Sequence, residues 1–276
     1  MNLSNGHSIP TPGFGTFKIP DGEVCVNAVC DAITAGYTHI DTAAVYGNER
    51  SVGEGVRKSG KAREELFITS KVWNTERGYD TTLRACEKTL KDLGMDYLDL
   101  YLIHWPANRL QFGDKAESIN VETWKAMERL ADEGLVRSIG VSNFCPHHLA
   151  PILASANLVP AVDQIEFHPG LLQEDTMDIC RQNQILVEAW SPLGRGRLLD
   201  DPLLVEVAAC YGKTTAQIVL RWVMQKNVLP LVKSTHIERI RENLQIFDFE
   251  LTAEDVARID SLPENRLSRH PDEVEF

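Results

Sequence analysis

The fold is decided by the stretch Leu66–His104, LFITSKVWNTERGYDTTLRACEKTLKDLGMDYLDLYLIH. It begins with one short apolar run, Leu66–Val72, and ends with a second, Leu98–His104. Between them, four apolar side chains have the spacing of one helical face, and Gly94 follows as a stop signal. A strand, a helix and a second strand in this order predict a βαβ unit with two parallel strands.

The same alternation continues along the rest of the chain. Helical patterns include an apolar stripe from Val121 to Ala131 and capping boxes at Thr214–Gln217 and Thr252–Asp255. Further β-rich runs occur at Gly13–Phe17, His39–Ala43, Arg137–Ser142, Val162–Phe167, Ile185–Trp190 and Val228–Lys233. Eight units without a linker favour an α/β fold, a single-domain (β/α)8 TIM barrel over residues 1–276. An open doubly wound sheet is the alternative.

Composition narrows the class of protein. The chain has 276 residues, of which 43% are hydrophobic and 25% charged, as in globular proteins. Its net charge is −12 and no basic stripe occurs, which argues against nucleic acid and anionic membranes as partners. The six cysteines are scattered without a C-x-x-C pair, so we expect reduced thiols. No secretory leader or membrane-length apolar run is found, and we expect a cytoplasmic protein.

Polar residues fall at the ends of three successive apolar runs. Asp41 ends the run HID, Lys71 ends FITSK and His104 ends LYLIH. Tyr46 lies five residues after Asp41. Because active sites of α/β barrels form at the C-terminal strand ends, we expect these four side chains to meet at one rim.

This set of groups suits the donation of a proton to a carbonyl oxygen. A free tyrosine has a pKa of about 10, and a lysine cation beside it lowers that pKa. We therefore expect Tyr46 to be the acid, Lys71 to tune it and Asp41 to hold Lys71. His104 is suited to hydrogen-bond and orient the carbonyl oxygen. Because no side chain supplies a hydride, a cofactor must do so.

Each of these residues has an ordinary explanation when taken alone. Asp41 is then a turn residue and Tyr46 a half-buried aromatic with a satisfied hydroxyl. Lys71 is then a surface charge and His104 a core histidine. Their joint placement at successive strand ends favours the catalytic interpretation.

Seven segments in chain order resemble the aldo-keto reductase family. They cover nearly the whole chain: GYTHIDTAAVYGNE (36–49), LFITSKVWN (66–74), DLYLIHWP (99–106), IGVSNF (139–144), DQIEFHP (163–169), SPLGRG (191–196) and VKSTHIERIRENL (232–244). The segments RLSRHPDEV (266–274) and HWPAN (104–108) are most similar to the bacterial 2,5-diketo-D-gluconate reductases. The resemblance implies an NADPH-dependent reductase of aldehydes or ketones, with the tetrad Asp41, Tyr46, Lys71 and His104.

The resemblance also implies the cofactor and substrate sites. Residues matching family positions for the nicotinamide and its neighbourhood are Thr16, Phe17, Ser142, Asn143, Gln164 and Trp190, the last by stacking on the ring. Residues matching the pyrophosphate loop are Ser191, Leu193 and Gly194. Those matching the 2′-phosphate pocket are Lys233, Ser234, Thr235 and Arg239, and those for the adenine are Glu242 and Asn243. Residues matching the substrate pocket are Phe17, Trp73, His104 and Trp105.

The chain departs from the family pattern in a few places. Thr38 stands where the family has Arg, and Val232 where it has Pro. The N-terminus looks a few residues short, so we expect only a short N-terminal hairpin at the barrel bottom. The tail after about Leu262 is expected to fold over the active-site rim and to help set specificity. A small-molecule carbonyl substrate and a monomeric state are the remaining expectations.

Three other functions compete with this prediction. A Rossmann dehydrogenase requires G-x-G-x-x-G after the first strand, and this motif is missing. A metal-dependent hydrolase requires several ligands on one rim, where Lys71 would repel the cation. The pair His147-His148 and His168 have no partner at i+4, so we interpret them as structural or surface residues and expect no metal. A cofactor-sensing barrel with slow turnover is the third alternative.

Overall fold

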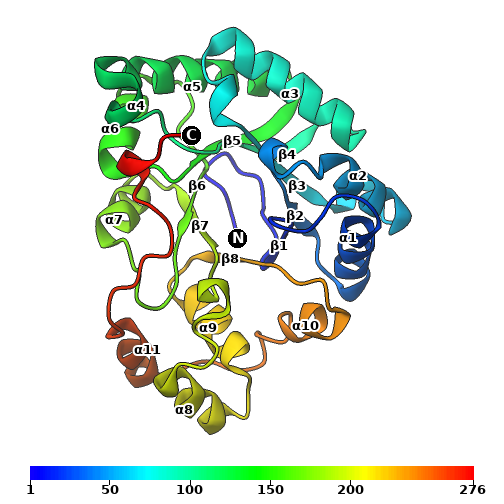
Figure 1. Ribbon diagram of the computed structural model, residues 1–276, viewed down its shortest axis with the longest axis vertical. Coiled ribbons are helices and arrows are strands. Elements are labelled where there is room, and N and C mark those ends of the chain that lie inside the picture. The colour runs from blue at the N-terminus through cyan, green and yellow to red at the C-terminus, as the bar shows by residue number, and fades with distance from the viewer.

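A computed structural model describes all residues, Met1–Phe276. Eight strands form one closed barrel in which each strand pairs with its neighbours in chain order and β8 pairs with β1 (Figure 1). All pairs are parallel. The strands are β1 (Gly13–Gly15), β2 (His39–Asp41), β3 (Phe67–Val72), β4 (Leu98–Ile103), β5 (Val136–Ser142), β6 (Val162–Glu166), β7 (Leu186–Trp190) and β8 (Leu229–Val232). The predicted (β/α)8 barrel is thereby confirmed, and the open sheet of the Rossmann alternative is wrong.

Helices surround the barrel on its outside (Figure 1). They are α1 (Glu23–Ala35), α2 (Glu49–Lys58), α3 (Tyr79–Leu93), α4 (Arg109–Phe112), α5 (Ala116–Asp132), α6 (Pro146–Ser155), α7 (Glu174–Gln182), α8 (Pro202–Tyr211), α9 (Thr215–Gln225), α10 (Ile237–Glu242) and α11 (Ala253–Asp260). None of these helices alone has the length and hydropathy of a membrane span. Helices α8 and α9 reach that length and hydropathy only when taken together, and they are bent by 90° relative to each other.

Helix ends follow the local sequence signals in two of three cases. Gly94 ends α3 with a left-handed φ of 66°, as a glycine readily can. The capping box before α9 is complete, because Thr214 and Gln217 each accept a backbone N–H of the other. The box predicted before α11 is only half formed: Thr252 accepts from the Asp255 N–H, whereas its own N–H donates to the Tyr211 hydroxyl.

The apolar core has two parts. The larger cluster, 50 buried residues, fills the space between the strands and the helices. The smaller one joins Leu3 and Ile9 of the N-terminal hairpin to side chains of β3, β4, β6 and β8. An antiparallel bridge between Asn2 and Ser8 and the hydrogen bonds beside it hold this short hairpin. It closes one end of the barrel, as the sequence predicts.

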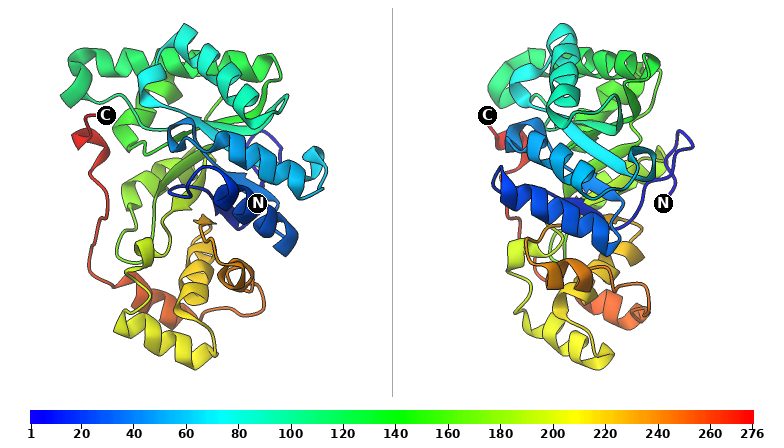
Figure 2. Two further views of the ribbon diagram at one scale, coloured as in Figure 1. Left: turned by 45° about the vertical axis from the view of Figure 1, so that its right-hand side comes forward. Right: turned by 90° about the vertical axis from the view of Figure 1, so that its right-hand side faces the viewer.

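The chain after α11 forms a C-terminal strap, residues 263–276, on the side of the barrel opposite the N-terminal hairpin (Figure 2). The strap is hydrogen-bonded to two loops at the rim. The Asn265 N–H donates to the Gly170 carbonyl at 2.8 Å. Asn108 donates to the carbonyls of Pro271 and Val274 at 2.9 and 2.8 Å. The tail thus lies at the rim, where the sequence predicts it.

Candidate active site

Three neighbouring parallel strands bring the predicted tetrad together at one rim. Asp41 is the last residue of β2, Lys71 is the last but one of β3, and His104 follows β4 directly. Tyr46 ends the short 3-10 helix η1 (Ala44–Tyr46), which follows β2. The even spacing of these residues along the sequence therefore corresponds to neighbouring positions in space.

Lys71 and Asp41 form a buried ion pair. The Lys71 ammonium lies 2.7 Å from both oxygens of the Asp41 carboxylate and 2.8 Å from the Thr42 carbonyl. The Lys71 side chain is fully buried. Burial alone would lower the pKa of Lys71, but the neighbouring acidic groups, Asp41 foremost, together outweigh burial and raise the pKa, so the ammonium is retained. Since both Asp41 oxygens bind Lys71, this carboxylate does not suit the metal-dependent alternative.

Tyr46 lines the cleft beside the ion pair. The Lys71 ammonium is 5.3 Å from the centre of the Tyr46 ring. The rings of Phe17 and His104 lie 5.0 and 5.7 Å from it. Burial raises the pKa of Tyr46, and Lys71 acts in the opposite direction without overcoming it. The sign of the Lys71 effect is the expected one, and the phenol is protonated at neutral pH.

His104 is uncharged at neutral pH. Burial, with a smaller contribution from the Lys71 cation, lowers the pKa of His104 well below its ordinary value of 6.5. Its ring packs edge-on against Trp73 at 5.1 Å and against Tyr46. A neutral imidazole beside the Tyr46 phenol can donate one hydrogen bond to a carbonyl oxygen.

A cleft of about 1120 Å³ opens at this rim. Because small-molecule sites measure roughly 300–1,000 Å³, it can take an extended dinucleotide together with a small substrate. Most residues expected to bind cofactor or substrate line it: Phe17, Trp73, His104, Trp105, Ser142, Asn143, Gln164, Trp190, Ser191, Leu193, Lys233, Ser234, Thr235, Arg239, Glu242 and Asn243.

Two expected cofactor residues lie outside the lining of the cleft. Thr16 is fully buried, and its hydroxyl donates to the Asp41 carbonyl at 3.0 Å. Its side chain therefore holds the end of β2. Gly194 is also buried and has a φ of 60°, while its neighbours Leu193 and Arg195 line the cleft. Gly194 shapes this loop through its backbone.

Asn143 connects the middle of the cleft to the tetrad. Its side-chain amide donates to the His104 carbonyl at 2.9 Å and to the Ser142 hydroxyl at 3.0 Å. Its oxygen accepts a hydrogen bond from the indole N–H of Trp190 at 2.9 Å. The half-buried Trp190 ring is thus fixed at the cleft surface, where it can stack on a planar ring.

The other end of the cleft is positively charged. Lys233 and Arg239 are exposed there, beside the hydroxyls of Ser234 and Thr235 at the start of α10. Glu242, expected at the adenine, accepts a hydrogen bond from Thr214 at 2.8 Å. Cations and hydroxyls at one end and a fixed indole near the tetrad fit a phosphorylated nicotinamide dinucleotide.

Several lining residues are absent from the sequence prediction. Arg195 lies 5.9 Å above the Trp190 ring and has a left-handed φ of 55°. In the sequence, the position of Arg195 between two glycines of the SPLGRG loop could have indicated that it lines the cleft. Phe276 stacks on Trp73 at 5.4 Å and packs edge-on against Trp105 at 5.3 Å. Only the general course of the tail, and not this contact, could be predicted.

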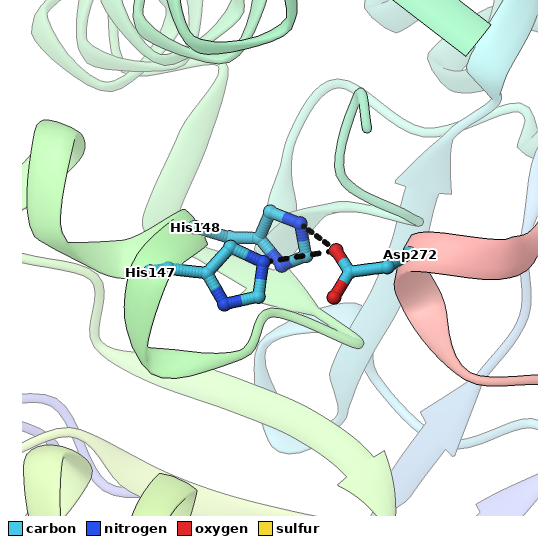
Figure 3. A group of neighbouring side chains, drawn as sticks. All are labelled: His147, His148 and Asp272. Atoms are coloured by element: carbon cyan, nitrogen blue, oxygen red, sulfur yellow. Dashed lines mark hydrogen bonds and ion pairs between the residues drawn. The ribbon is translucent and has the colours of Figure 1, made fainter. Parts of the chain in front are cut away.

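A cluster of imidazoles anchors the strap beside the cleft. His147 and His148 at the start of α6 both point at Asp272 of the strap, with distances of 2.9 and 3.0 Å (Figure 3). Their ligand atoms lie within 4.8 Å of one another, as in some metal sites. However, the Nδ1 atom of His148 accepts the Cys145 N–H at 3.1 Å, so its proton sits on Nε2. A metal on Nε2 would require the opposite tautomer. The cluster is therefore a hydrogen-bonded anchor.

Fold and site together define a carbonyl-reducing oxidoreductase of the barrel type that uses a nicotinamide cofactor. The aldo/keto reductase family model matches residues 13–264, and the chain belongs to this family. It is 49% identical to the glyoxal reductase of Bacillus subtilis, over 100% of this chain and 97% of that protein. It is also 49% identical to the uncharacterized oxidoreductase YtbE of the same species, over 99% and 96%. A crystal structure of a Gox0644 mutant in complex with NADPH superposes with a TM-score of 0.92 at 38% identity, over 100% and 98%.

Proposed function

We propose that this protein is an NADPH-dependent reductase of small aldehydes and ketones, with Tyr46 as its general acid. The observation that carries the proposal is the buried Asp41–Lys71 pair beside the Tyr46 phenol, in a cleft whose volume can hold a dinucleotide. NADPH, when bound, supplies the hydride. The protein residues supply the proton, the orientation and the exclusion of water.

The cofactor is expected to lie along the cleft. Trp190 and the amides of Asn143 and Gln164 would hold its nicotinamide end. Ser191 and Leu193 would contact the pyrophosphate, and the backbone of Gly194, which is buried behind the lining of the cleft, would shape this loop. Lys233, Ser234, Thr235 and Arg239 would bind the 2′-phosphate, with Glu242 and Asn243 at the adenine. An Arg and a Lys at the 2′-phosphate support a preference for NADPH over NADH.

The proton is delivered by Tyr46. Its raised pKa keeps the phenol protonated, and the Lys71 cation beside it stabilises the phenolate left after transfer. Asp41 holds Lys71 in place. His104, neutral and packed against Trp73, donates a hydrogen bond that orients the carbonyl oxygen.

Small dicarbonyl compounds are the proposed substrate class. The inner end of the cleft has aromatic walls, Phe17, Trp73, Trp105 and Phe276, which leave a compact and largely apolar space. Glyoxal and methylglyoxal fit this description, and the 49% identity to a glyoxal reductase supports them. The similarity of RLSRHPDEV and HWPAN to 2,5-diketo-D-gluconate reductases makes that sugar acid the second candidate.

The test measures the oxidation of NADPH and NADH at 340 nm with glyoxal, methylglyoxal and 2,5-diketo-D-gluconate. We expect turnover with NADPH, a KM for NADH at least about tenfold higher because the 2′-phosphate contacts are lost, and the highest kcat/KM with a dicarbonyl aldehyde. Tight NADPH binding without turnover of any carbonyl would favour the cofactor-sensing alternative. Loss of turnover on addition of a chelator would favour a metal enzyme. We further propose a cytoplasmic monomer, which size-exclusion chromatography tests for the oligomeric state.

A further inference from the structure

A second buried carboxyl group lies inside the barrel next to the tetrad. Glu188, in the middle of β7, is fully buried and pairs in register with Gln164 of β6. Neither residue spacing nor family resemblance singles it out. A fully buried glutamate is rare unless it binds a partner, so its contacts need an explanation.

Gln164 links Glu188 to the catalytic ion pair. The side-chain Nε2 of Gln164 donates to Glu188 Oε2 and to Asp41 Oδ2, both at 2.9 Å. An amide nitrogen carries two hydrogens, and both are used by these two carboxyl groups. Nothing in the protein donates to the Gln164 Oε1 atom, and Gln164 lines the cleft.

The two carboxyl groups fix which way the amide points. If the Gln164 amide turned over, its Oε1 would face Asp41 Oδ2 without a donor between them, and Glu188 Oε2 would no longer receive the amide N–H. Two buried acceptors would then lose their hydrogen bond, which costs about 1–3 kcal/mol each. Both oxygens of Asp41 also accept hydrogen bonds from Lys71. Glu188 Oε2, in contrast, accepts a hydrogen bond from Gln164 alone.

We propose that Glu188 is a positioning residue, which fixes the Gln164 amide so that Oε1 faces the cleft and accepts a hydrogen bond from the carboxamide N–H of the nicotinamide. This inference rests on the proposed function, in which Gln164 binds the nicotinamide end of NADPH. Glu188 itself does not touch the cofactor, because Gln164 lies between them and Glu188 is fully buried.

The surroundings of Glu188 are consistent with this role. Burial, with a smaller contribution from the Asp41 charge, raises the pKa of Glu188 to about 8. The group is thus mainly neutral at pH 7, when its Oε2 accepts as a carbonyl oxygen does. His39 is the other titratable group beside Glu188. Its Nε2 atom lies 3.9 Å from Glu188 Oε1, too far for a hydrogen bond, and is hydrogen-bonded to the Thr69 hydroxyl at 3.0 Å. A neutral acceptor can be replaced by an amide without disturbing the local charge.

The test compares Glu188→Leu with Glu188→Gln. Leucine fills a similar volume without an acceptor, whereas glutamine keeps a carbonyl oxygen that can accept from Gln164. Calorimetric titration gives the Kd of each variant for NADPH and for 2′-phospho-ADP-ribose, which has the same phosphates but no nicotinamide. Thermal melting checks that both variants fold, and wild-type turnover of glyoxal is measured in parallel.

For Glu188→Leu we expect a Kd for NADPH about 3–10-fold higher, the effect of one neutral hydrogen bond. The Kd for 2′-phospho-ADP-ribose should be unchanged, and Glu188→Gln should stay within about twofold of wild type for both ligands. Equal weakening of both ligands, an unchanged Kd for NADPH in Glu188→Leu, or an equal loss in Glu188→Gln would each overturn the positioning role. A wild-type chain that binds NADPH but reduces no carbonyl would overturn the proposed function and leave the Kd comparison valid.

Discussion

The proposed catalytic residues are held by partners that are themselves buried. Asp41 and Lys71 neutralise each other inside the barrel, and removing either would leave an unpaired buried charge, which typically costs about 3–5 kcal/mol. Substitution of either residue alone is therefore expected to destabilise the folded protein. Its position beside Tyr46 gives that phenol a cation on one side and the cleft on the other.

His104 leads to a prediction about the pH dependence of catalysis. Its pKa is well below 6.5 in the folded protein, so the imidazole stays neutral as the pH falls through the range in which a free histidine takes up a proton. We expect kcat/KM for carbonyl reduction to be flat from about pH 8 down to about pH 6. The pH–rate profile measures this. An inflection near pH 6.5 that disappears in His104→Gln would contradict it.

At the residue scale, the sequence predicts the polar residues at the rim of the barrel better than the buried polar residue Glu188 behind them. Asp41, Lys71 and His104 end apolar runs, so their spacing alone places them together. Glu188 lies within an apolar run, where a charged residue gives no periodic signal. Its role depends on a hydrogen bond to Gln164 on the neighbouring strand β6, a partner that the pairing register of the two strands determines.

At the scale of elements, the C-terminal strap is held by polar contacts in addition to the packing of its last residue, Phe276. Glu166, at the end of β6, accepts from the N–H groups of Leu267 and Ser268 at 2.7 and 3.2 Å. Asp272 binds the imidazoles of His147 and His148. These contacts place Phe276 against Trp73 and Trp105, in the wall of the proposed substrate pocket.

Weakening one anchor should loosen the strap. Both imidazoles contact the same oxygen, Asp272 Oδ1, and in Asp272→Asn the negative charge that strengthens these two hydrogen bonds is lost. We expect backbone amides of residues 267–276 to exchange with deuterium about 3–10-fold faster, with the barrel strands unchanged. Hydrogen-exchange mass spectrometry measures this at pH 7.

The matched control for this change is Glu275→Gln. Glu275 is exposed and makes no side-chain contact with the strap anchors. Its replacement should leave exchange unchanged. If Asp272→Asn behaved like this control, the imidazole cluster would not be an anchor of the strap.

The hydrophobic periodicity and the residues typical of helix ends predict the helices and strands themselves. They do not predict the contacts between these elements. All eight strands lie within two residues of the expected runs, because buried parallel strands are continuously apolar. The cap of α11 differs because a distant hydroxyl, that of Tyr211, takes the Thr252 N–H. Likewise, the strap contacts join residues far apart in the sequence, for example Asn108 with Pro271 and Glu166 with Leu267, beyond any local pattern.

At the scale of the whole molecule, stability and chemistry lie at opposite ends of the barrel. The N-terminal hairpin closes one end with Leu3 and Ile9. The cleft and strap occupy the other, as the positions of the two termini in Figure 2 illustrate. Changes at the closed end should therefore alter unfolding without altering the active site.

Ile9→Ala tests this separation. Ile9 is buried, and the substitution leaves a cavity against β4 and β8, so we expect the free energy of unfolding to fall by about 2–5 kcal/mol. The values of kcat and KM at 25 °C should not change. Urea denaturation measures the first and steady-state assays the second. Ser8→Ala, at an exposed neighbour, serves as the control and should change neither.

The central claim is that Tyr46 donates the proton in an NADPH-dependent reduction, and Tyr46→Phe tests it most directly. The measurement is the single-turnover rate of NADPH oxidation with glyoxal, together with the Kd for NADPH. Removing the general acid should lower the rate by about 10²–10⁴-fold while the Kd stays within about twofold of wild type. A variant that retains more than about a tenth of the wild-type rate would contradict the assignment of Tyr46 as the acid.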